Sequence, residues 1–235
     1  MNVFDVIAFD GDDTLWHNET LYAAAQAEFR GLLEKHHPAE TVDRRLYQTE
    51  MRNLEFYGYG IKSFTLSMIE TATELADGRL TAEEVRAILA IGRSMLTAEV
   101  QLLEHAEPTV AQLAGVYPLM LITKGDLRDQ KRKLAKSGLA PHFRHIEIVT
   151  SKTRGDFEEI LGKYQIDPAH FLMVGDSLRS DVVPVLELGG QVVHIPYKLA
   201  WAHEVVPNAH STGPGYHHLE HLGLLPSLVQ EIENG

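Results

Sequence analysis

The sequence predicts an α/β protein, a doubly wound parallel sheet with a helical domain inserted after the first strand. A first apolar run at residues 3–9 is followed, over residues 106–195, by four more that alternate with helical segments. Residues 17–105 contain only patterns of helical period. Polar side chains follow each apolar run, and in open α/β sheets ligands bind beyond the carboxyl ends of the strands. These polar residues are therefore the first candidates for a functional site.

Five short apolar runs are the predicted strands. The first, VFDVIAF, is interrupted only by Asp5, which is typical of a strand buried on both faces of a parallel sheet. The other runs lie at residues 117–123, 146–150, 171–174 and 191–195. The predicted helices lie at residues 108–114, 127–137, 155–164 and 181–188. Gly138 ends the second of these helices, and the pair Gly189-Gly190 ends the fourth.

Residues 17–105 interrupt this alternation with four stretches whose apolar residues recur at helical spacing. Thr81 with Glu84 forms a capping-box signature at the start of the fourth stretch. We interpret residues 17–105 as an inserted helical domain, and residues 1–16 with 106–235 as the α/β core.

Beyond residue 195 the chain is rich in proline, glycine and histidine, which predicts a surface loop before a last helix at 219–232. The histidines of this loop lack the i, i+4 pair on a helix that a zinc site usually shows. We therefore expect them to be ordinary surface residues.

The amino-acid composition and net charge exclude or disfavour several classes of function. The chain of 235 residues has no cysteine, which excludes disulfides, zinc–thiolate sites and cysteine nucleophiles. A formal net charge of -12 disfavours binding to a nucleic-acid backbone. The N-terminus does not resemble a signal peptide, and no apolar stretch approaches the roughly 18 residues of a membrane helix. We expect a cytoplasmic protein without a membrane partner, either a monomer or a homodimer.

Three aspartates stand within four positions in FDGDDTL, directly behind the first predicted strand. Two carboxylates about 4 Å apart repel by about 4 kcal/mol at an effective dielectric constant of about 20, and a divalent cation would turn this repulsion into binding. Ligands that are all oxygen atoms suit Mg²⁺, which commonly joins carboxylates to a substrate phosphate. Asp10 and Asp12 occupy positions i and i+2 of an extended backbone, so both side chains point to the same side.

Further polar residues follow the other predicted strands: the pair Thr123-Lys124, then Lys152, then Asp176 with Asp181. Together they supply the groups that phosphoryl transfer needs. One carboxylate can attack phosphorus, and another can act as general acid on the leaving oxygen and then as general base on water. Thr123 and Lys152 can hold the non-bridging oxygens, and Asp176 can complete a metal site.

In this combination the sequence resembles the haloacid dehalogenase (HAD) superfamily, whose four motifs occur in order. The motif residues are Asp10, Asp12 and Thr14 in DxDxT, then Thr123, then Lys152, then Gly175, Asp176, Ser177, Ser180 and Asp181 in GDSxxSD. The core motifs span residues 1–16 and 106–195, and the resemblance implies a Rossmann-like core. The insert between the first two motifs is similar to the helical C1-type cap of HAD subfamily I.

The resemblance also implies a role for each matching residue. Asp10 would be the nucleophile and a Mg²⁺ ligand, and Asp12 would be the acid/base and give its backbone carbonyl to the metal. Asp176 would be a metal ligand, with Asp181 as a further ligand or as a residue that orients one. The implied cofactor is Mg²⁺, and the implied partner is a small phosphorylated substrate.

Two departures from the family pattern matter. Asp13 stands where the family often has glycine, and we expect it to point away from the phosphate or to cap the following turn. The family's KPDP sequence is absent around Lys152, so the assignment of this lysine rests on its position. Asp12 itself favours phosphate-ester chemistry, because members that cleave carbon–halogen bonds generally lack an acid there.

Substrate selection is expected from the helical insert. In EFYGYGIKSF two glycines interrupt the helical pattern, which could lower Tyr57 or Lys62 toward the substrate. The alternative is that the tyrosine packs between helices and the lysine is solvated. Lys124, beside Thr123, either adds positive potential at the phosphate or merely sits on the rim.

The sequence therefore predicts a Mg²⁺-dependent phosphatase that acts on a small phosphomonoester through an aspartyl-phosphate. A phosphomutase of the same superfamily is the alternative enzyme, because it needs the same residues. A phosphorylatable receiver-like module is a third alternative of a regulatory class. The substrate is not identified by the residues.

Overall fold

The computed structural model describes residues 3–34, 37–77, 79–199, 201, 204 and 213–234. The chain divides into two compact units. The core unit comprises Met1–Glu19, Val100–Lys124 and Gln130–Gly235, and the helical unit comprises Thr20–Glu99 and Gly125–Asp129. Among the described residues, no helix is both long enough and apolar enough to cross a membrane.

The two stretches that leave and re-enter the core unit pair with each other inside it. Leu103 N donates to Leu15 O and His17 N donates to Gln101 O, each over 2.9 Å. This antiparallel pairing keeps both stretches with the core unit. The sequence analysis had assigned residues 17–105 to the insert.

The core unit contains a parallel sheet. Within the described residues its strands are β1 (Val6–Phe9), β2 (Leu119–Lys124), β3 (Phe143–Val149), β4 (Phe171–Gly175), β5 (Gln191–His194) and β6 (Tyr216–His218). Their order is β3-β2-β1-β4-β5-β6, and each neighbouring pair is parallel. This order confirms the predicted doubly wound sheet, whose strand order reverses between β1 and β4, the place where such sheets bind ligands.

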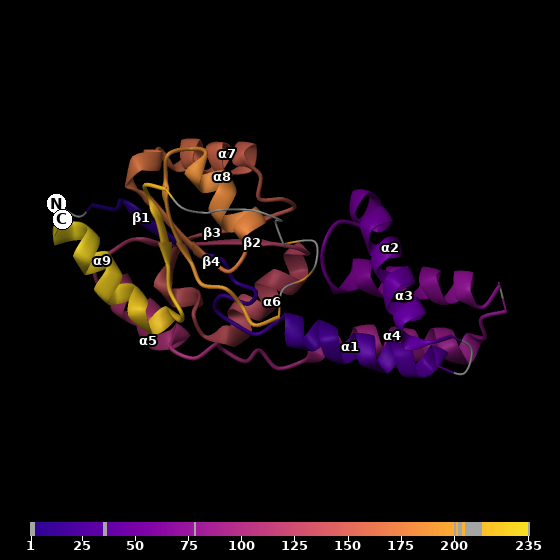
Figure 1. Cartoon of the computed structure of the whole chain (residues 1–235). Helices are drawn as coiled ribbons and strands as arrows, with labels where there is room; N and C mark the ends of the chain where they lie inside the picture. Colours follow the sequence, from indigo (N-terminus) through magenta and orange to yellow (C-terminus); the bar gives the residue numbers. More distant parts are fainter. Residues whose placement is uncertain are drawn as a thin grey trace. The chain divides into compact units, whose positions relative to one another are not determined.

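Helices cover both faces of this sheet, and Figure 1 shows α7 and α8 on one side of the strands with α5 and α9 on the other. The helices that lie wholly or mostly in the core unit are α5 (Ala106–Ala114), α6 (Leu127–Ser137), α7 (Arg154–Tyr164), α8 (Val183–Leu186) and α9 (Leu225–Asn234). Side chains of β1 alternate between the faces, as strand geometry requires. Phe9 lies in one buried cluster with Val110 of α5 and Val229 of α9, and Ala8 lies in the cluster that contains Phe157 of α7.

The helical unit consists mainly of α1 (Glu19–Leu33), α2 (Ala39–Tyr57), α3 (Ile61–Leu75) and α4 (Ala82–Thr97). Its buried apolar residues form one cluster that includes Phe29, Leu46, Met68 and Ile88. The predicted capping box is present at the start of α4. Short 3-10 turns in the core unit lie at Ala140–His142, Pro168–His170 and Leu222–Leu224.

The segment after residue 195 corrects the prediction of a surface loop. Tyr216–His218 form strand β6, which pairs with β5 through bonds such as Val192 N to Gly215 O at 2.8 Å. A three-residue polar edge strand leaves no apolar alternation in the sequence, so the pattern could not reveal it. The last helix also starts later than predicted, at Leu225. Of the histidines expected in this loop, His203 and His210 lie outside the described residues.

The helix predicted at 181–188 is a second correction. Leu178–Val182 form a π-type turn, and only Val183–Leu186 are α-helical. Pro184 stands near the start of that short helix, where proline is tolerated because the first amides lack intrahelical partners. Asp181 lies in this wide turn and is buried.

Candidate active site

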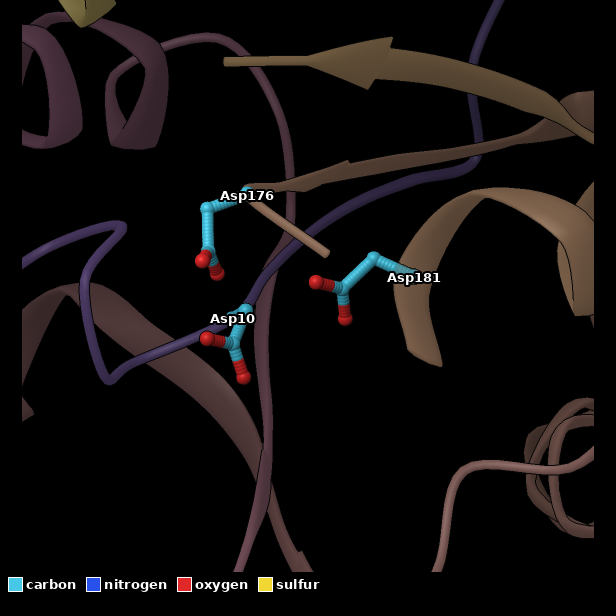
Figure 2. Close-up of side chains that lie close together, drawn as sticks. All are labelled: Asp10, Asp176 and Asp181. Atoms are coloured by element: carbon cyan, nitrogen blue, oxygen red, sulfur yellow. The ribbon is translucent and has the colours of Figure 1, made fainter. Parts of the chain in front are cut away.

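Three carboxylates gather beyond the carboxyl ends of β1 and β4. Asp10 follows β1, Asp176 follows β4, and Asp181 lies in the π-type turn. Each offers one oxygen, and these oxygens all lie within 4.8 Å of one another. Figure 2 shows the three side chains approaching one another from separate segments of the chain. Because β1 and β4 are neighbours in the sheet, the cluster stands at the point where the strand order reverses.

A glycine brings Asp181 into the cluster. A Cβ atom on Gly175 would lie 2.3 Å from Asp181 Oδ2, so no other residue fits there without moving that carboxylate. Ser177 N donates to the same oxygen over 3.1 Å, and Asp181 N donates back to Ser177 O. The π-type turn and the glycine together hold Asp181 against the end of β4.

Lys152 joins the cluster from the segment that precedes α7. Its ammonium contacts Asp10 Oδ1 and lies 2.7 Å from Asp181 Oδ1. Lys152 is 6% exposed and Asp10 is also 6% exposed, so this contact is shielded from solvent. The structure thus brings the lysine chosen on position alone into direct contact with the predicted nucleophile.

The cluster carries more negative than positive charge. Burial raises the pKa of Asp10 from 3.8 to about 7, and the Asp181 carboxylate adds to the rise while Lys152 opposes it. Burial and the nearby Asp10 charge raise the pKa of Asp176 well above its usual value. Burial alone would lower the pKa of Lys152, but Asp10 and Asp181 raise it above its ordinary range. Oxygen ligands with uncompensated charge fit a divalent cation such as Mg²⁺.

Thr123, at the end of β2, presents a hydroxyl beside this cluster. Within the part of the chain that the structure describes, its Oγ1 is buried and has no hydrogen-bond partner. A Cβ atom on Gly11 would lie 3.2 Å from this oxygen, which places the hydroxyl against the loop that follows Asp10. A buried donor without a partner is costly, so the site has a hydroxyl available for a ligand oxygen.

The Asp12 side chain is held by Trp16 and by two residues of α6 that were not predicted from the sequence. Lys133 Nζ lies 2.8 Å from Asp12 Oδ1, Gln130 Nε2 lies 2.9 Å from Oδ2, and Trp16 Nε1 donates to Oδ1 over 2.6 Å. Lys133 and Gln130 are buried on α6, where they look like ordinary helix residues in the sequence. Their spacing of three positions puts both on one face of the helix, but nothing in the sequence says which face meets Asp12.

The family model of the haloacid dehalogenase-like hydrolases matches residues 4–185 of this chain. The chain belongs to this family. This HAD-like hydrolase is therefore not a receiver domain, and the regulatory alternative from the sequence analysis is set aside.

Two curated proteins are similar to this HAD-like hydrolase. YfnB of Bacillus subtilis, named as a HAD-hydrolase, is 28% identical over 151 residues, 60% of this chain and 57% of YfnB, so the match spans little more than half of that protein. YigB of Escherichia coli, named as a 5-amino-6-(5-phospho-D-ribitylamino)uracil phosphatase, is 26% identical over 206 residues, 80% of this chain and 82% of YigB.

Solved structures share the fold. The crystal structure of a haloacid dehalogenase-like family hydrolase from Xanthomonas campestris has a TM-score of 0.88 and 35% identity, and the match covers 99% of this chain and 93% of that one. A crystal structure of YfnB bound to magnesium has a TM-score of 0.68 at 18% identity, over 97% of this chain and 99% of that one.

Asp13 adopts a backbone conformation that is uncommon for residues other than glycine. Its φ of 59° lies in the left-handed region that glycine adopts most easily. The carboxylate accepts from Asn18 N over 2.9 Å and from Glu19 N over 3.0 Å, so Asp13 caps the turn that leads into α1. Burial raises the pKa of Asp13 to about 7, and the two backbone amides oppose that rise.

Lys124, a predicted substrate contact, is engaged by the chain itself. Its Nζ lies 2.6 Å from Glu204 Oε1 and 3.0 Å from Ser180 Oγ, and Glu204 also accepts from Ser177 and Ser180. Burial alone would raise the pKa of Glu204, but Lys124 and the two hydroxyls lower it to about 2. The sequence analysis missed Glu204, because its partners lie far away along the chain.

Tyr57 and Lys62, the other predicted substrate contacts, belong to the helical unit. Tyr57 is the last residue of α2 and is 53% exposed. Lys62, in the first turn of α3, lies 2.9 Å from Asp126 Oδ2, a residue that groups with the same unit. Neither residue is part of the carboxylate cluster of the core unit, and their assignment to substrate binding stays a prediction.

Proposed function

We propose that this HAD-like hydrolase is a Mg²⁺-dependent phosphatase that hydrolyses a small phosphomonoester through an aspartyl-phosphate on Asp10. The observation that carries the proposal is the contact of buried Asp10 with Lys152, next to Asp176 and Asp181. The Thr123 hydroxyl, which has no hydrogen-bond partner among the described residues, supports the proposal, because phosphoryl transfer needs donors to the non-bridging oxygens.

Asp10, Asp176 and Asp181 would hold the metal through carboxylate oxygens, and Asp12 would add its backbone carbonyl. When bound, Mg²⁺ would neutralise these carboxylates and offset charge on the phosphoryl oxygens. The support from this chain is the donor set itself, oxygen ligands with more negative charge than Lys152 compensates.

Asp10 would attack the phosphorus atom, so that a bond from its carboxylate oxygen to phosphorus forms as the bond to the leaving oxygen breaks. Lys152 would hold that carboxylate in place, and Thr123 would donate its hydroxyl hydrogen to a non-bridging oxygen. Both groups lie on rigid parts of the core unit, the end of β2 and the segment before α7.

Asp12 would give its proton to the leaving oxygen and then take a proton from the water that cleaves the aspartyl-phosphate. Its carboxylate is oriented by Lys133, Gln130 and Trp16. The acid at this position supports phosphate-ester chemistry over cleavage of carbon–halogen bonds. The name of YigB supports the same choice.

The test is release of inorganic phosphate from a panel of small phosphomonoesters, with Mg²⁺ or with EDTA, together with halide release from 2-haloacids. Asp10→Asn removes the nucleophile, and Asp5→Asn is the matched control, because Asp5 is exposed in the same unit. We expect phosphate release that requires Mg²⁺ and Asp10 and is unaffected by Asp5→Asn.

Halide release without phosphate release would overturn the proposal. Labelling of Asp10 by acetyl phosphate without net hydrolysis would favour the phosphomutase instead. The panel also tests the expected partner class, a small phosphorylated molecule. The cytoplasmic location and the absence of a nucleic-acid partner stay predictions from the sequence.

A further inference from the structure

Strand β6, which the sequence did not reveal, brings Tyr216 beside a buried histidine of β5. His194 is the last residue of β5 and is 7% exposed. Its Nδ1 lies 3.0 Å from the Tyr216 hydroxyl, and its Nε2 lies 2.9 Å from the backbone oxygen of Asp176. The ring therefore bridges the edge strand and the peptide of a carboxylate in the active-site cluster.

The chemistry of the three groups fixes where the hydrogens lie. A backbone carbonyl oxygen can only accept, so Nε2 of His194 must carry a hydrogen and donate it to Asp176 O. In the neutral ring Nδ1 is then an acceptor, and the Tyr216 hydroxyl donates to it. A histidine with one nitrogen committed in this way has one defined tautomer.

The register of the sheet explains why the ring reaches this carbonyl. His194 is paired with Gly175, the residue before Asp176. Ile195 N donates to Gly175 O over 3.0 Å, so the carbonyls of Gly175, the last residue of β4, and of Asp176 are both bonded to residues at the end of β5. The Gly175 carbonyl accepts from a backbone N–H, and the Asp176 carbonyl accepts from a side chain.

We infer that His194 is a positioning residue for Asp176, with the Tyr216 hydroxyl donating to its other ring nitrogen. The inference rests on the proposed function in one respect, the role of Asp176 as a metal ligand. Anchoring the Asp176 carbonyl fixes the peptide from which its carboxylate projects toward Asp10 and Asp181 (Figure 2). Residues that orient metal ligands contribute to metal affinity without touching the ion.

A packing role alone would not need a histidine. A phenylalanine or leucine could fill the same volume, but it would leave the Asp176 carbonyl without its donor. A glutamine retains an N–H that can reach the carbonyl. This difference separates positioning from packing in an experiment.

The tautomer is measured first, by ¹⁵N chemical shifts of the histidine rings in the full-length protein without metal. The chain has 13 histidines, and the His194 signals are assigned by their loss in His194→Gln. We expect the Nε2–H tautomer at neutral pH and a changed Nδ1 shift in Tyr216→Phe. The Nδ1–H tautomer in the native protein would overturn the inference.

Binding of Mg²⁺ is then measured by titration calorimetry, with unfolding temperatures recorded for each variant. We expect His194→Ala to bind Mg²⁺ about tenfold more weakly and His194→Gln to recover most of the affinity. His217→Ala is the matched control, because its ring lies on β6 beside Gln191 and should leave the affinity unchanged.

The Mg²⁺ titrations distinguish failure of the proposed function from failure of the inference about His194. If the native protein bound no Mg²⁺, the metal part of the proposed function would fail, and the positioning role with it. If the native protein and folded His194→Ala bound Mg²⁺ equally, only the inference would fail. Should His194→Ala not fold, the tautomer of the native protein and the Mg²⁺ affinity of His194→Gln decide. An Nδ1–H tautomer, or a loss of affinity of about tenfold in His194→Gln although its amide can still donate to the carbonyl, contradicts the inference.

Discussion

Lys133 Nζ on α6 lies within 2.9 Å of both carboxylate oxygens of Asp12. The Lys133 side chain is buried, and it also donates to Asn18 Oδ1 over 2.8 Å. One ammonium thus ties the loop after β1 to the start of the chain that leads into α1. The proposed acid/base is held in place by a residue that has no role in the family motifs quoted above.

Removing this ammonium should destabilise the protein, because Asp12 and Asn18 would lose a buried partner. We expect Lys133→Met to lower the free energy of unfolding by about 2 kcal/mol, measured by urea denaturation. Lys163→Met is the control, because Lys163 forms an exposed pair with Glu147 whose loss should change stability far less. Equal effects of the two substitutions would contradict the role assigned to Lys133.

Gly175→Ala should displace Asp181, because the new Cβ would lie 2.3 Å from its carboxylate. Overpacking of this kind costs about 1–3 kcal/mol, and we expect phosphatase activity to fall at least tenfold as well. Gly162→Ala in α7 is the matched control, since its Cβ meets nothing within 4 Å. Activity of Gly175→Ala close to that of the control would mean that the position of Asp181 does not matter.

The raised pKa of Glu50 predicts how the stability of the folded protein depends on pH. This residue of α2 is 9% exposed, and its Oε2 has no partner among the described residues. Burial raises its pKa from 4.5 to about 7. Between these two values the folded state holds the proton more tightly than the unfolded state, so stability from this group is complete at low pH and is lost as pH rises toward 7.

Glu50→Gln should remove the loss of stability that accompanies the rise in pH. At pH 8 we expect the variant to be more stable than the native protein by up to about 3 kcal/mol, whereas near pH 4.5 the two should be nearly equal. Urea denaturation at both pH values measures the difference. A gain of the same size at both pH values would show that titration of Glu50 is not its cause.

Glu204→Gln should change how the site binds anions. Glu204 compensates the charge of Lys124 at 2.6 Å, next to Thr123. Without the carboxylate, we expect inorganic phosphate to inhibit the enzyme at a several-fold lower concentration. In the double variant Lys124→Met/Glu204→Gln, the stronger inhibition by phosphate should disappear. Unchanged inhibition by phosphate in Glu204→Gln would place Lys124 outside the reach of the substrate.

The sequence predicted the parts of this fold that repeat a pattern. Buried parallel strands produce apolar runs, and polar residues directly after them locate the rim of the sheet. This reasoning placed Asp10, Asp176 and Lys152 at one edge before any coordinates. The doubly wound order followed from alternating strands and helices, and the structure confirms it.

Residues that act through partners distant in the chain left no such pattern. Glu204 reaches Lys124, and His194 reaches Asp176, only because the sheet has formed. Lys133 looks like any polar residue of an amphipathic helix until the face that meets Asp12 is known. Strand β6 is too short and too polar to alternate visibly. These features depend on tertiary contacts, which periodicity does not encode.

The adjacency of β1 and β4 has a consequence for how the protein is made. Asp10 precedes the whole helical unit and strands β2 and β3 in the chain, and Asp176 follows them. Pairing β1 with β4 closes a loop that contains all of these elements, and such distant contacts form slowly during folding. Asp10 and Asp176 therefore meet only after the ribosome has released most of the chain. A polypeptide that ends before β4 carries Asp10 without Asp176, so it has neither their mutual repulsion nor the carboxylate cluster.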